Sequence, residues 1–362
     1  MKRFACMMLT ALLFCSAVNA AETPAVSAKS YVLMDADSGR VLCGENIDEP
    51  RLIASITKLM TALVALESGH ALDEVVTIRQ EWTGIEGSSL YLKPGEQVRL
   101  ETLLYGLLLR SGNDAAQAIA GFCAESIDCF VSLMNQKASM LGMKNTSFAN
   151  PSGLNAENHY SSAYDMALLA RACLENETLK KIVATKDITL ENRLFSNHNK
   201  LLRQYEGCIG LKTGYTEKAG RTLVSAAQRN GITLICVTLC DPNDWADHSA
   251  LFDYGFSKYE QCVFVRAGEL ICTVPVQGSL IPLCQIRAEE DISAVLESGG
   301  TPAIEFKLTE NNFTAPMPKG KRVGSLVLCS NGEPIKEVEL SLTHAIPQNT
   351  PEENHIFGFW GR

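Results

Sequence analysis

The sequence predicts an α/β (α+β) fold in which a large domain of mixed helices and strands precedes a small all-β domain. The chain has 362 residues, which is enough for one large and one small domain. Up to about residue 257, helical patterns occur together with strand-like runs. From about residue 258, short β-type runs follow one another and are separated by Gly, Pro and Asn, as in an antiparallel β domain.

Residues 1–20 are predicted to be a secretory signal peptide and not part of the fold. Lys2 and Arg3 precede the apolar stretch 4–18, and small residues lead to cleavage after Ala20. The apolar stretch is too short to span a bilayer comfortably. A lipid-modified Cys15 is disfavoured because Phe14 stands where a small residue is wanted. We therefore expect export to the outer face of the cytoplasmic membrane, the periplasm or the cell wall.

The composition argues against several classes of partner and cofactor. The formal net charge is −9 and no basic cluster appears, so nucleic-acid binding is not indicated. Two of the 13 cysteines lie in the signal peptide, and most of the other 11 stand singly in apolar runs, where a thiol behaves as a small hydrophobe. Pairs at 123 and 129 or at 236 and 240 are the alternatives. No CxxC motif or His at ligand spacing is present, so we expect no metal and no cofactor.

The elements of the large domain, residues 21–257, can be placed in order. A hairpin is expected over 30–44, followed by a helix over 54–67 that is apolar nearly all round and therefore central. Further helical patterns lie near 101–123, 126–141 and 162–174. Strands at 222–228 and 233–239 flank the turn 229–231, and a last helix spans about 244–253.

The C-terminal part is predicted to be a small β-sandwich-like domain over 258–345, followed by a polar tail over 346–362. Its β-type runs are expected at 263–265, 270–276, 281–286, 303–308, 324–329 and 338–342. The tail ends in a short apolar tip with Ile356, Phe357, Phe359 and Trp360. The tip is too short for a stable isolated helix, so the sequence predicts at most weak peripheral contact with a membrane.

The first chemical motif is Ser55-Ile56-Thr57-Lys58, at the start of the apolar helix. Residues three apart share one face of a helix, so the Lys58 amine can reach the Ser55 hydroxyl. A serine needs such a base before it can attack a carbonyl, and a lysine serves when burial and a nearby cation lower its pKa. Alone the motif is weak, because Ser and Lys at a helix start are common.

Two further motifs follow in a fixed order. Ser111-Gly112-Asn113 lies between two helical runs, where a loop would present a hydroxyl and an amide; helix capping is the ordinary alternative. Lys212-Thr213-Gly214 closes the strand-like run 208–211. On an edge strand, Lys212 and Thr213 can bind a carboxylate, and Gly214 permits close approach of a substrate backbone; a solvated lysine is the alternative. The ordered set is specific, and it is the set found in penicillin-binding proteins and β-lactamases.

The chain resembles the low-molecular-weight penicillin-binding proteins, which are D-alanyl-D-alanine carboxypeptidases of peptidase family S11. The resemblance covers about residues 28–345 and is carried by the stretches Ile53–Thr61, Leu109–Ala116, Asn150–Leu154, His159–Ala167 and Gly210–Thr216. It implies a β-lactamase/transpeptidase-like domain with an antiparallel sheet flanked by helices. It also implies peptidoglycan stem peptides as the substrate and β-lactam antibiotics as covalent inhibitors.

The resemblance also implies a role for each motif residue. Ser55 is the acylated nucleophile, Lys58 its base, and Ser111 passes a proton to the leaving D-alanine. Asn113 orients the peptide stem, and Lys212, Thr213 and Gly214 bind the end of the substrate. The backbone N–H groups of Ser55 and Tyr215 form the oxyanion hole. His159 and Asp165 are expected to brace the surrounding loops.

One departure and two rival readings remain. Relatives often carry a carboxylate-binding arginine after the strand that follows Lys-Thr-Gly, but the segment 241–248 has none. A class A β-lactamase is disfavoured because Pro151 stands where its deacylating glutamate would be, and Gly112 where it carries aspartate. A catalytically inactive wall-binding homologue is disfavoured because the motif residues are all intact.

Overall fold

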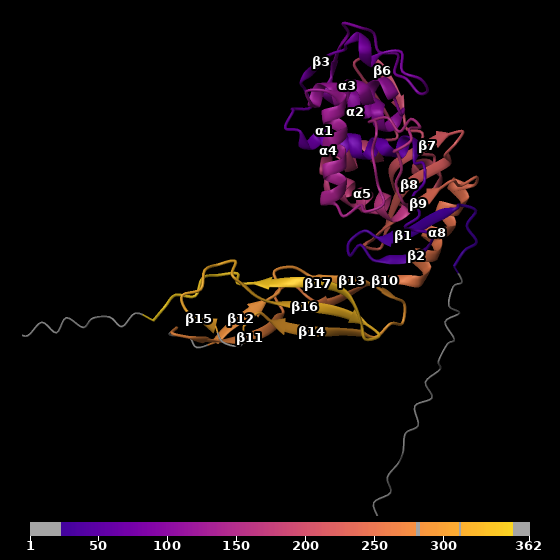
Figure 1. Ribbon diagram of the computed structural model, residues 1–362. Coiled ribbons are helices and arrows are strands. Elements are labelled where there is room, and N and C mark those ends of the chain that lie inside the picture. The colour runs from indigo at the N-terminus through magenta and orange to yellow at the C-terminus, as the bar shows by residue number, and fades with distance from the viewer. Residues whose placement is uncertain (1–22, 280–282, 311–312, 350–362) are drawn as a thin grey trace, which may run out of the picture.

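The computed structural model describes residues 23–279, 283–310 and 313–349. The predicted signal peptide and the apolar tip of the tail lie outside these residues. Figure 1 shows a large domain of helices around a sheet and, beside its lower end, an elongated β domain. The mixed fold class predicted from the sequence is confirmed.

The large domain is built on one five-stranded antiparallel sheet with the strand order β2-β1-β9-β8-β7, which leaves β7 at an edge. The strands are β1 (Ser30–Asp35), β2 (Val41–Glu45), β7 (Cys208–Thr216), β8 (Gly220–Arg229) and β9 (Ile232–Leu239). Two short hairpins lie outside this sheet: β3 (Val75–Thr77) with β4 (Gln97–Arg99), and β5 (Asp187–Leu190) with β6 (Arg193–Ser196).

Helices cover both faces of the sheet. They are α1 (Lys58–Glu67), α2 (Leu100–Leu109), α3 (Asn113–Cys123), α4 (Ile127–Met140), α5 (Ala163–Glu175), α6 (Glu177–Ala184), α7 (Leu201–Gln204) and α8 (Asp244–Lys258), with 3₁₀ turns at Ala54–Thr57 and Gln80–Trp82. Because successive strand residues point to opposite faces, Val32 of β1 joins the core with α1, and Leu33 joins the core with α8. Every residue of α1 from Lys58 to Ala65 is buried, as its apolar sequence predicts.

Two predicted helix boundaries differ from those in the structure. The helical pattern near 101–123 is divided into α2 and α3 at residues 110–112, close to the loop expected between two helical runs, because Ser111 has a left-handed backbone with φ of 64°. The last helix does not end near residue 253 but continues to Lys258, where β10 follows directly. The predicted domain boundary at 257 stays a prediction. Among the described residues, no single helix is long and apolar enough to cross a membrane; α3 and α4 pass that test only as a pair, bent by 90°.

The C-terminal region consists of β-strands around its own core. The strands are β10 (Tyr259–Val265), β11 (Leu270–Gln277), β12 (Leu283–Arg287), β13 (Ile292–Glu297), β14 (Pro302–Leu308), β15 (Phe313–Thr314), β16 (Arg322–Ser330) and β17 (Glu333–Ser341). They form the pair β10-β13 and the sheets β12-β11-β15 and β14-β16-β17. Val274, Phe313 and Leu328 are fully buried in the core between them.

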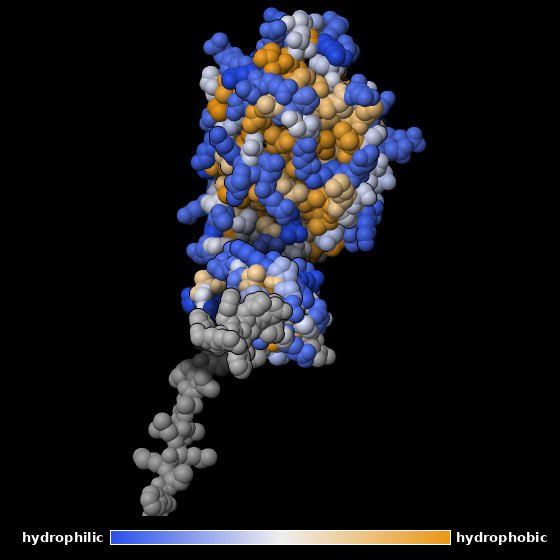
Figure 2. Space-filling view, turned by 90° about the vertical axis from the view of Figure 1, so that its left-hand side faces the viewer, coloured by the Kyte–Doolittle hydropathy of each residue, from blue (hydrophilic) through white to orange (hydrophobic). Residues whose placement is uncertain are grey.

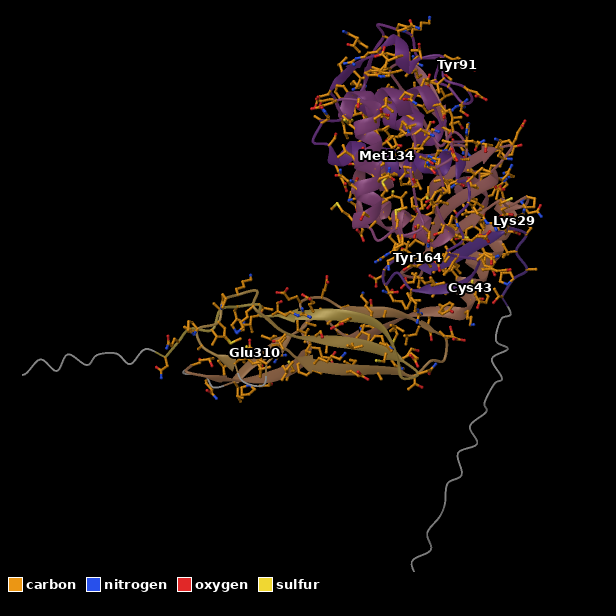
Figure 3. The ribbon with its side chains drawn as sticks, in the orientation of Figure 1. Lys29, Cys43, Tyr91, Met134, Tyr164 and Glu310 are labelled. Atoms are coloured by element: carbon orange, nitrogen blue, oxygen red, sulfur yellow. The ribbon has the colours of Figure 1, made fainter. Side chains whose placement is uncertain are left out.

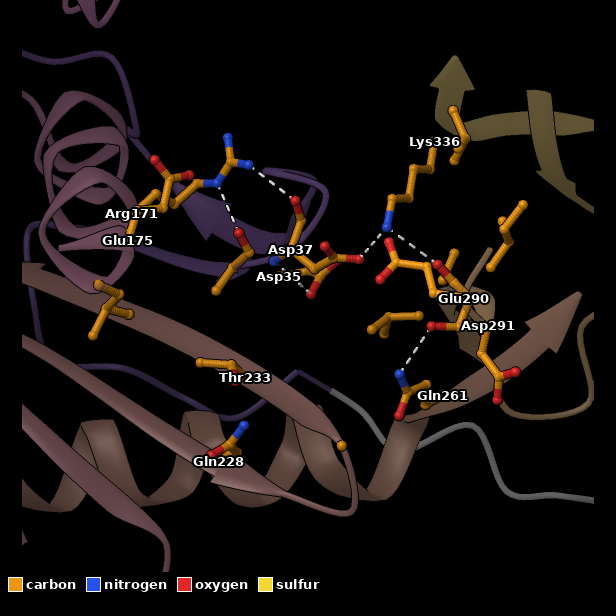
Figure 4. A pocket seen from close by; sticks show the side chains of 18 of the residues that line it. Asp35, Asp37, Arg171, Glu175, Gln228, Thr233, Gln261, Glu290, Asp291 and Lys336 are labelled. Carbon is orange, nitrogen blue, oxygen red and sulfur yellow. Dashed lines mark hydrogen bonds and ion pairs between the residues drawn. The ribbon is translucent and has the colours of Figure 1, made fainter. Parts of the chain in front are cut away.

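The turn between β1 and β2 contacts the C-terminal strands. Lys336 of β17 donates to Asp37 Oδ2 at 2.6 Å and to the Ser293 carbonyl oxygen at 3.2 Å. Arg171 of α5 donates to the carbonyl oxygens of Ala36 and Asp37 and so supports the same turn. A cavity of about 780 Å³ lies between the two parts at this point (Figure 4). Beside the cavity, Arg40 of the same turn donates to the Val295 carbonyl oxygen at 2.8 Å, and Tyr259 and Val295 pack into the core of the large domain with Leu33.

The surface of the large domain carries apolar side chains among hydrophilic ones (Figure 2). Tyr91, Met140, Leu194 and Tyr215 are among the large hydrophobic residues that are more than half exposed. Tyr91 lies at the end of the large domain away from the C-terminal strands (Figure 3). Single exposed apolar residues of this kind are ordinary in soluble proteins.

Candidate active site

The first element of the site is the turn that carries Ser55. A 3₁₀ turn, Ala54–Thr57, precedes α1, so Lys58 is the first residue of the α-helix and Ser55 precedes the helix. Residues i and i+3 eclipse one another in a 3₁₀ turn, which places Lys58 directly over Ser55. Lys58 Nζ lies 2.8 Å from Ser55 Oγ, within hydrogen-bond distance. The pair predicted from Ser-x-x-Lys is therefore in hydrogen-bond contact.

The backbone beside Ser55 is held by a second loop. Ala54 has a φ of 48°, an uncommon value for a residue with a side chain. Gly153 packs against the Ala54 carbonyl so closely that an added Cβ would come well within 3.0 Å of its oxygen, and its own φ is 87°. Only glycine fits both conditions, so the loop 150–154 is shaped to support the turn of Ser55.

Lys58 is completely buried and surrounded by acceptors. Besides Ser55 Oγ, its Nζ contacts Asn113 Oδ1 at 2.7 Å and the carbonyl oxygen of Ser152. Burial, with a further contribution from the charge of Lys212, lowers the pKa of Lys58 well below its ordinary value. A neutral amine has two N–H groups and one lone pair. Asn113 and Ser152 can take the two protons, so the lone pair is left for the Ser55 hydroxyl.

The Ser111–Asn113 segment lies between α2 and α3 and is fixed by a neighbouring loop. Asn113 donates from Nδ2 to the carbonyl oxygen of Glu86 at 2.5 Å and from its backbone to that of Ser88 at 2.7 Å. Its amide oxygen is thereby directed to Lys58. Ser111 is 5% exposed. Within the described chain, no hydrogen bond joins the Ser111 hydroxyl to Ser55 or Lys58.

Asp114 anchors this neighbouring loop to the second motif. Its buried carboxylate accepts hydrogen bonds from the backbone of Leu90 at 2.9 Å and of Leu92 at 3.1 Å, and from Ser89 Oγ at 2.6 Å. Tyr91, between those donors, is held in the left-handed region with φ of 58°. Asp114 thus couples the loop to the position of Asn113.

The third motif was expected to close its strand, but it lies in the middle of β7. The reason is that the pairing of β7 with β8 continues to Thr216. Lys212 is buried, donates to the Thr213 carbonyl oxygen at 2.7 Å, and has its pKa lowered to about 7 by burial. A Cβ on Gly214 would stand 2.9 Å from Ser55 N. Thr213 is half-buried and Tyr215 is exposed. The edge strand therefore packs directly against the Ser55 turn.

His159 braces the Ser55 turn from the opposite side. Its Nδ1 accepts from the Ala149 backbone at 3.1 Å, so Nε2 carries the proton and donates to Thr57 Oγ1 at 2.7 Å. Thr57 in turn donates to the Ala54 carbonyl oxygen at 2.8 Å. Burial and the charge of Lys58 lower the pKa of His159 to about 4, which favours the neutral ring that these hydrogen bonds require. Asp165 similarly holds Asn145 and Thr146.

Of the basic side chains around the site, the sequence singled out Arg221 but not His198. Arg221 donates to Asp244 Oδ1 at 2.8 Å and lies over Trp245, on the α8 side of the sheet. His198 follows the hairpin β5-β6, and partial burial with the charges of Lys212 and Arg110 lowers its pKa to about 4. His198 was not predicted, because no local pattern brings residue 198 near residue 212.

Two backbone carbonyl groups were also missed by sequence reasoning. The oxygens of Ser152 and Glu86 orient Lys58 and Asn113, yet neither residue was given a role. The stretch Asn150–Leu154 was singled out only because of the family resemblance. Asn150 Oδ1 accepts from the backbone of Ser152 at 3.1 Å and of Gly153 at 2.8 Å, so an Asx-type turn is the local signal that marks this loop. Among the described residues, no group of three or more His, Cys, Asp or Glu could hold a metal ion.

Comparisons with known proteins agree with this geometry. The family model for D-alanyl-D-alanine carboxypeptidases, Peptidase S11, matches residues 17–243. The chain is 36% identical over 325 residues to the D-alanyl-D-alanine carboxypeptidase DacF of Bacillus subtilis, covering 86% of this chain and 83% of DacF. It is 33% identical to DacA of Escherichia coli K12, covering 99% of this chain and 94% of DacA. The crystal structure of penicillin-binding protein 5 from Haemophilus influenzae superposes with a TM-score of 0.79 at 31% identity, covering 91% of this chain and all of that one.

The penicillin-binding fold, with a Ser-Lys pair beside an edge strand, places this chain in the class of serine peptidases. The chain belongs to peptidase family S11, the D-alanyl-D-alanine carboxypeptidases.

Proposed function

We propose that this chain removes the terminal D-alanine from peptidoglycan stem peptides through an acyl-enzyme on Ser55, and that β-lactam antibiotics acylate the same hydroxyl. The observation that carries the proposal is the 2.8 Å contact between Lys58 Nζ and Ser55 Oγ, with a fully buried amine whose other two partners are both acceptors. Such an amine is a base poised beside a nucleophile.

Acylation follows from this arrangement. Lys58 takes the Ser55 proton while Ser55 Oγ attacks the carbonyl carbon of the penultimate D-alanine. The resulting oxyanion is stabilised by the backbone N–H groups of Ser55 and Tyr215, which belong to the two segments in closest approach. One such donor is worth about 3 kcal/mol of transition-state stabilisation.

Release of D-alanine reverses the proton path. The carbon–nitrogen bond breaks, and the leaving amine receives the proton from Lys58 by way of the Ser111 hydroxyl. Asn113 orients the stem peptide, while Lys212 and Thr213 bind the terminal carboxylate and Gly214 leaves room for the substrate backbone. A water molecule then attacks the ester carbonyl, passes its proton to Lys58, and frees the shortened stem and the Ser55 hydroxyl.

A β-lactamase activity is not supported by the loop 150–154. In this position the chain offers the Pro151 carbonyl oxygen to Thr61 at 2.7 Å and that of Ser152 to Lys58, and the loop carries no carboxylate side chain. A carbonyl oxygen cannot serve as the general base for deacylation. The penicilloyl ester is therefore expected to be long-lived, and nitrocefin turnover negligible.

Export and membrane contact remain part of the proposal. The relatives' names as carboxypeptidases and penicillin-binding proteins support a substrate at the cell wall, outside the cytoplasmic membrane. Cleavage after Ala20 and weak membrane contact through 356–360 stay predictions. Fractionation of the full chain and of a chain ending at residue 350 tests the contact.

The decisive experiment locates the acylated residue. The protein is incubated with penicillin, digested and analysed by mass spectrometry, and D-alanine release is measured from a Lys-D-Ala-D-Ala peptide. Ser55→Ala should lose both adduct and release. The control Ser68→Ala removes a hydroxyl at the other end of α1, which donates to the Ala65 carbonyl oxygen at 2.7 Å, and should keep both adduct and release. An adduct on another residue, or release that survives Ser55→Ala, would overturn the proposal.

A further inference from the structure

The strand β14 is an exposed edge of the C-terminal sheet. In the order β14-β16-β17 it pairs with β16 on one side, and within the described residues no strand pairs with its other side. All of its residues, Pro302–Leu308, are exposed. An edge of this kind presents a row of unpaired backbone N–H and C=O groups, which another strand can complete.

The direction of these backbone groups can be read from the pairing with β16. The Thr309 N–H donates to the Val323 carbonyl oxygen at 3.0 Å, toward β16. Since successive residues of a strand direct their backbone groups to opposite sides, Glu305 and Lys307 also bond toward β16. The backbone groups of the alternate residues, Ile304, Phe306 and Leu308, therefore face outward and are available to a second strand.

The side chains of the same three residues continue the apolar core to the edge. Phe306 stands opposite Leu326 and Ile304 opposite Leu328, and both leucines are buried in the core of the C-terminal region. Residues directly opposite one another project from the same face of a sheet. Yet Ile304 is 42% exposed and Phe306 40% exposed, because the core ends at this strand.

The sequence of β14 is complementary to its own antiparallel copy. It alternates apolar and charged residues around a central aromatic residue, in the order Ile304-Glu305-Phe306-Lys307-Leu308. Reversing this order keeps the apolar positions and exchanges the acidic and basic positions. In an antiparallel pair of two copies centred on Phe306, each Glu305 faces a Lys307 and each Ile304 faces a Leu308. Phe306, whose backbone faces outward, sits on the two-fold axis as a hydrogen-bonded pair.

We propose that β14 is a homodimerisation edge, at which two copies of this chain pair antiparallel about Phe306. The product is one continuous sheet with three strands from each copy. Neighbouring registers are disfavoured, because centring on Glu305 places two carboxylates opposite each other and centring on Lys307 places two ammonium groups opposite each other. The charge pattern thus selects the partner and the register together.

The dimer leaves the active site free. β14 is at the edge of its sheet opposite to β17, and β17 carries Lys336, which bonds to Asp37 of the large domain. Figure 1 shows β14 on the side of the C-terminal region that faces away from the large domain. Two peptidase domains would therefore be carried on one joined base without covering Ser55.

The competing interpretation is that Lys307 and Pro302 protect the edge against pairing, as lysine and proline do in many monomeric proteins. Charge reversal distinguishes the two. Glu305→Lys leaves only lysines at the two positions, and Lys307→Glu leaves only glutamates, so each variant opposes like charges in its own dimer. A mixture of the two variants restores both opposite-charge pairs.

Sedimentation velocity of the full mature chain measures the effect from about 1 μM to about 1 mM, because a single strand pair makes a small, weak interface. The native chain should dimerise with concentration, each reversed variant should dimerise at least about tenfold more weakly, and the mixture should recover the native affinity. The controls Lys319→Glu and Glu289→Lys change exposed charges on the same domain and should behave like the native chain.

Three results would overturn the proposal: a native chain that stays monomeric throughout, a dimer indifferent to both reversals, or a mixture that fails to recover. D-alanine release should be the same in all variants, and equal thermal unfolding midpoints should show that each is folded. The substitutions lie on an exposed strand, so loss of the fold is not expected to mask the result.

Discussion

Replacing Gly153 with alanine should damage acylation of Ser55 far more than a comparable glycine replacement elsewhere. The new Cβ would meet the Ala54 carbonyl oxygen well inside 3.0 Å, and that carbonyl belongs to the residue before Ser55, the proposed nucleophile. The Gly153 backbone also has a φ of 87°. The left-handed conformation costs alanine about 1–2 kcal/mol, and the overlap about 1–3 kcal/mol more.

The overlap can be relieved only by moving backbone, because a carbonyl group cannot rotate away as a flexible side chain can. The two loops must separate by about 1 Å, and a displacement of that size at a reacting group typically costs about 100-fold in rate. The neighbouring Ser152 carbonyl, a partner of Lys58, moves with the same loop. We therefore expect a fall of about 100-fold in the rate of acylation by fluorescent penicillin.

Gly142→Ala is the matched control. Gly142 has a φ of 76° and no atom within 4 Å of an added Cβ, so it shares the backbone strain but not the contact. Both variants are compared by thermal unfolding and by the acylation rate of the folded protein. Gly142→Ala should unfold slightly earlier and react normally. If Gly153→Ala unfolds and reacts like the control, the contact with the Ala54 carbonyl does not position Ser55.

Three further predictions concern charge, pH and thiols. In Lys212→Met, loss of the nearby charge should raise the pKa of Lys58 and move the acid limb of the limiting acylation rate to higher pH. The control Lys218→Met should leave the pH profile unchanged. An acid limb that does not move in Lys212→Met would contradict an electrostatic effect of Lys212 on Lys58. The pKa of His159 is about 4 in the folded protein and 6.5 in a free histidine. The neutral ring therefore contributes about 3 kcal/mol to the free energy of unfolding; this contribution is complete above pH 6.5 and is lost as the pH falls toward 4. Urea unfolding of His159→Gln should show a weaker dependence over that range, and an unchanged slope would argue against it. All 11 cysteines from Cys43 to Cys329 are free in the structure, so titration of the denatured mature chain should find about that many thiols, and a reductant should leave its unfolding midpoint unchanged.

Much of the architecture follows from patterns that are visible in the sequence. The all-round apolar character of residues 58–65 predicts a central helix, and the turn at 229–231 predicts the hairpin of β8 and β9, both of which are present. Spacing alone also brings Lys58 to Ser55, since three residues of a helix or 3₁₀ turn suffice for that contact. Local periodicity determines these features.

What the sequence did not reveal depends on contacts between distant segments. The short elements α6, β5 and β6 lack a long apolar period and were not predicted. The extension of β7 beyond Gly214 arises from pairing with β8. The carbonyl partners of Lys58 and Asn113 come from loops 94 and 27 residues away, and any residue type supplies a carbonyl. Such groups leave no trace in composition or spacing.

The central claim is that Lys58 is an uncharged amine held against the Ser55 hydroxyl. It is tested most directly by titrating the folded protein with isotopically labelled lysine and following the side-chain signals by NMR, with Lys58→Arg and Lys212→Arg used for assignment. We predict that the Lys58 signal reports a neutral amine at pH values where exposed lysines are still fully protonated. A Lys58 signal that titrates together with the exposed lysines, near pH 10.5, would contradict it.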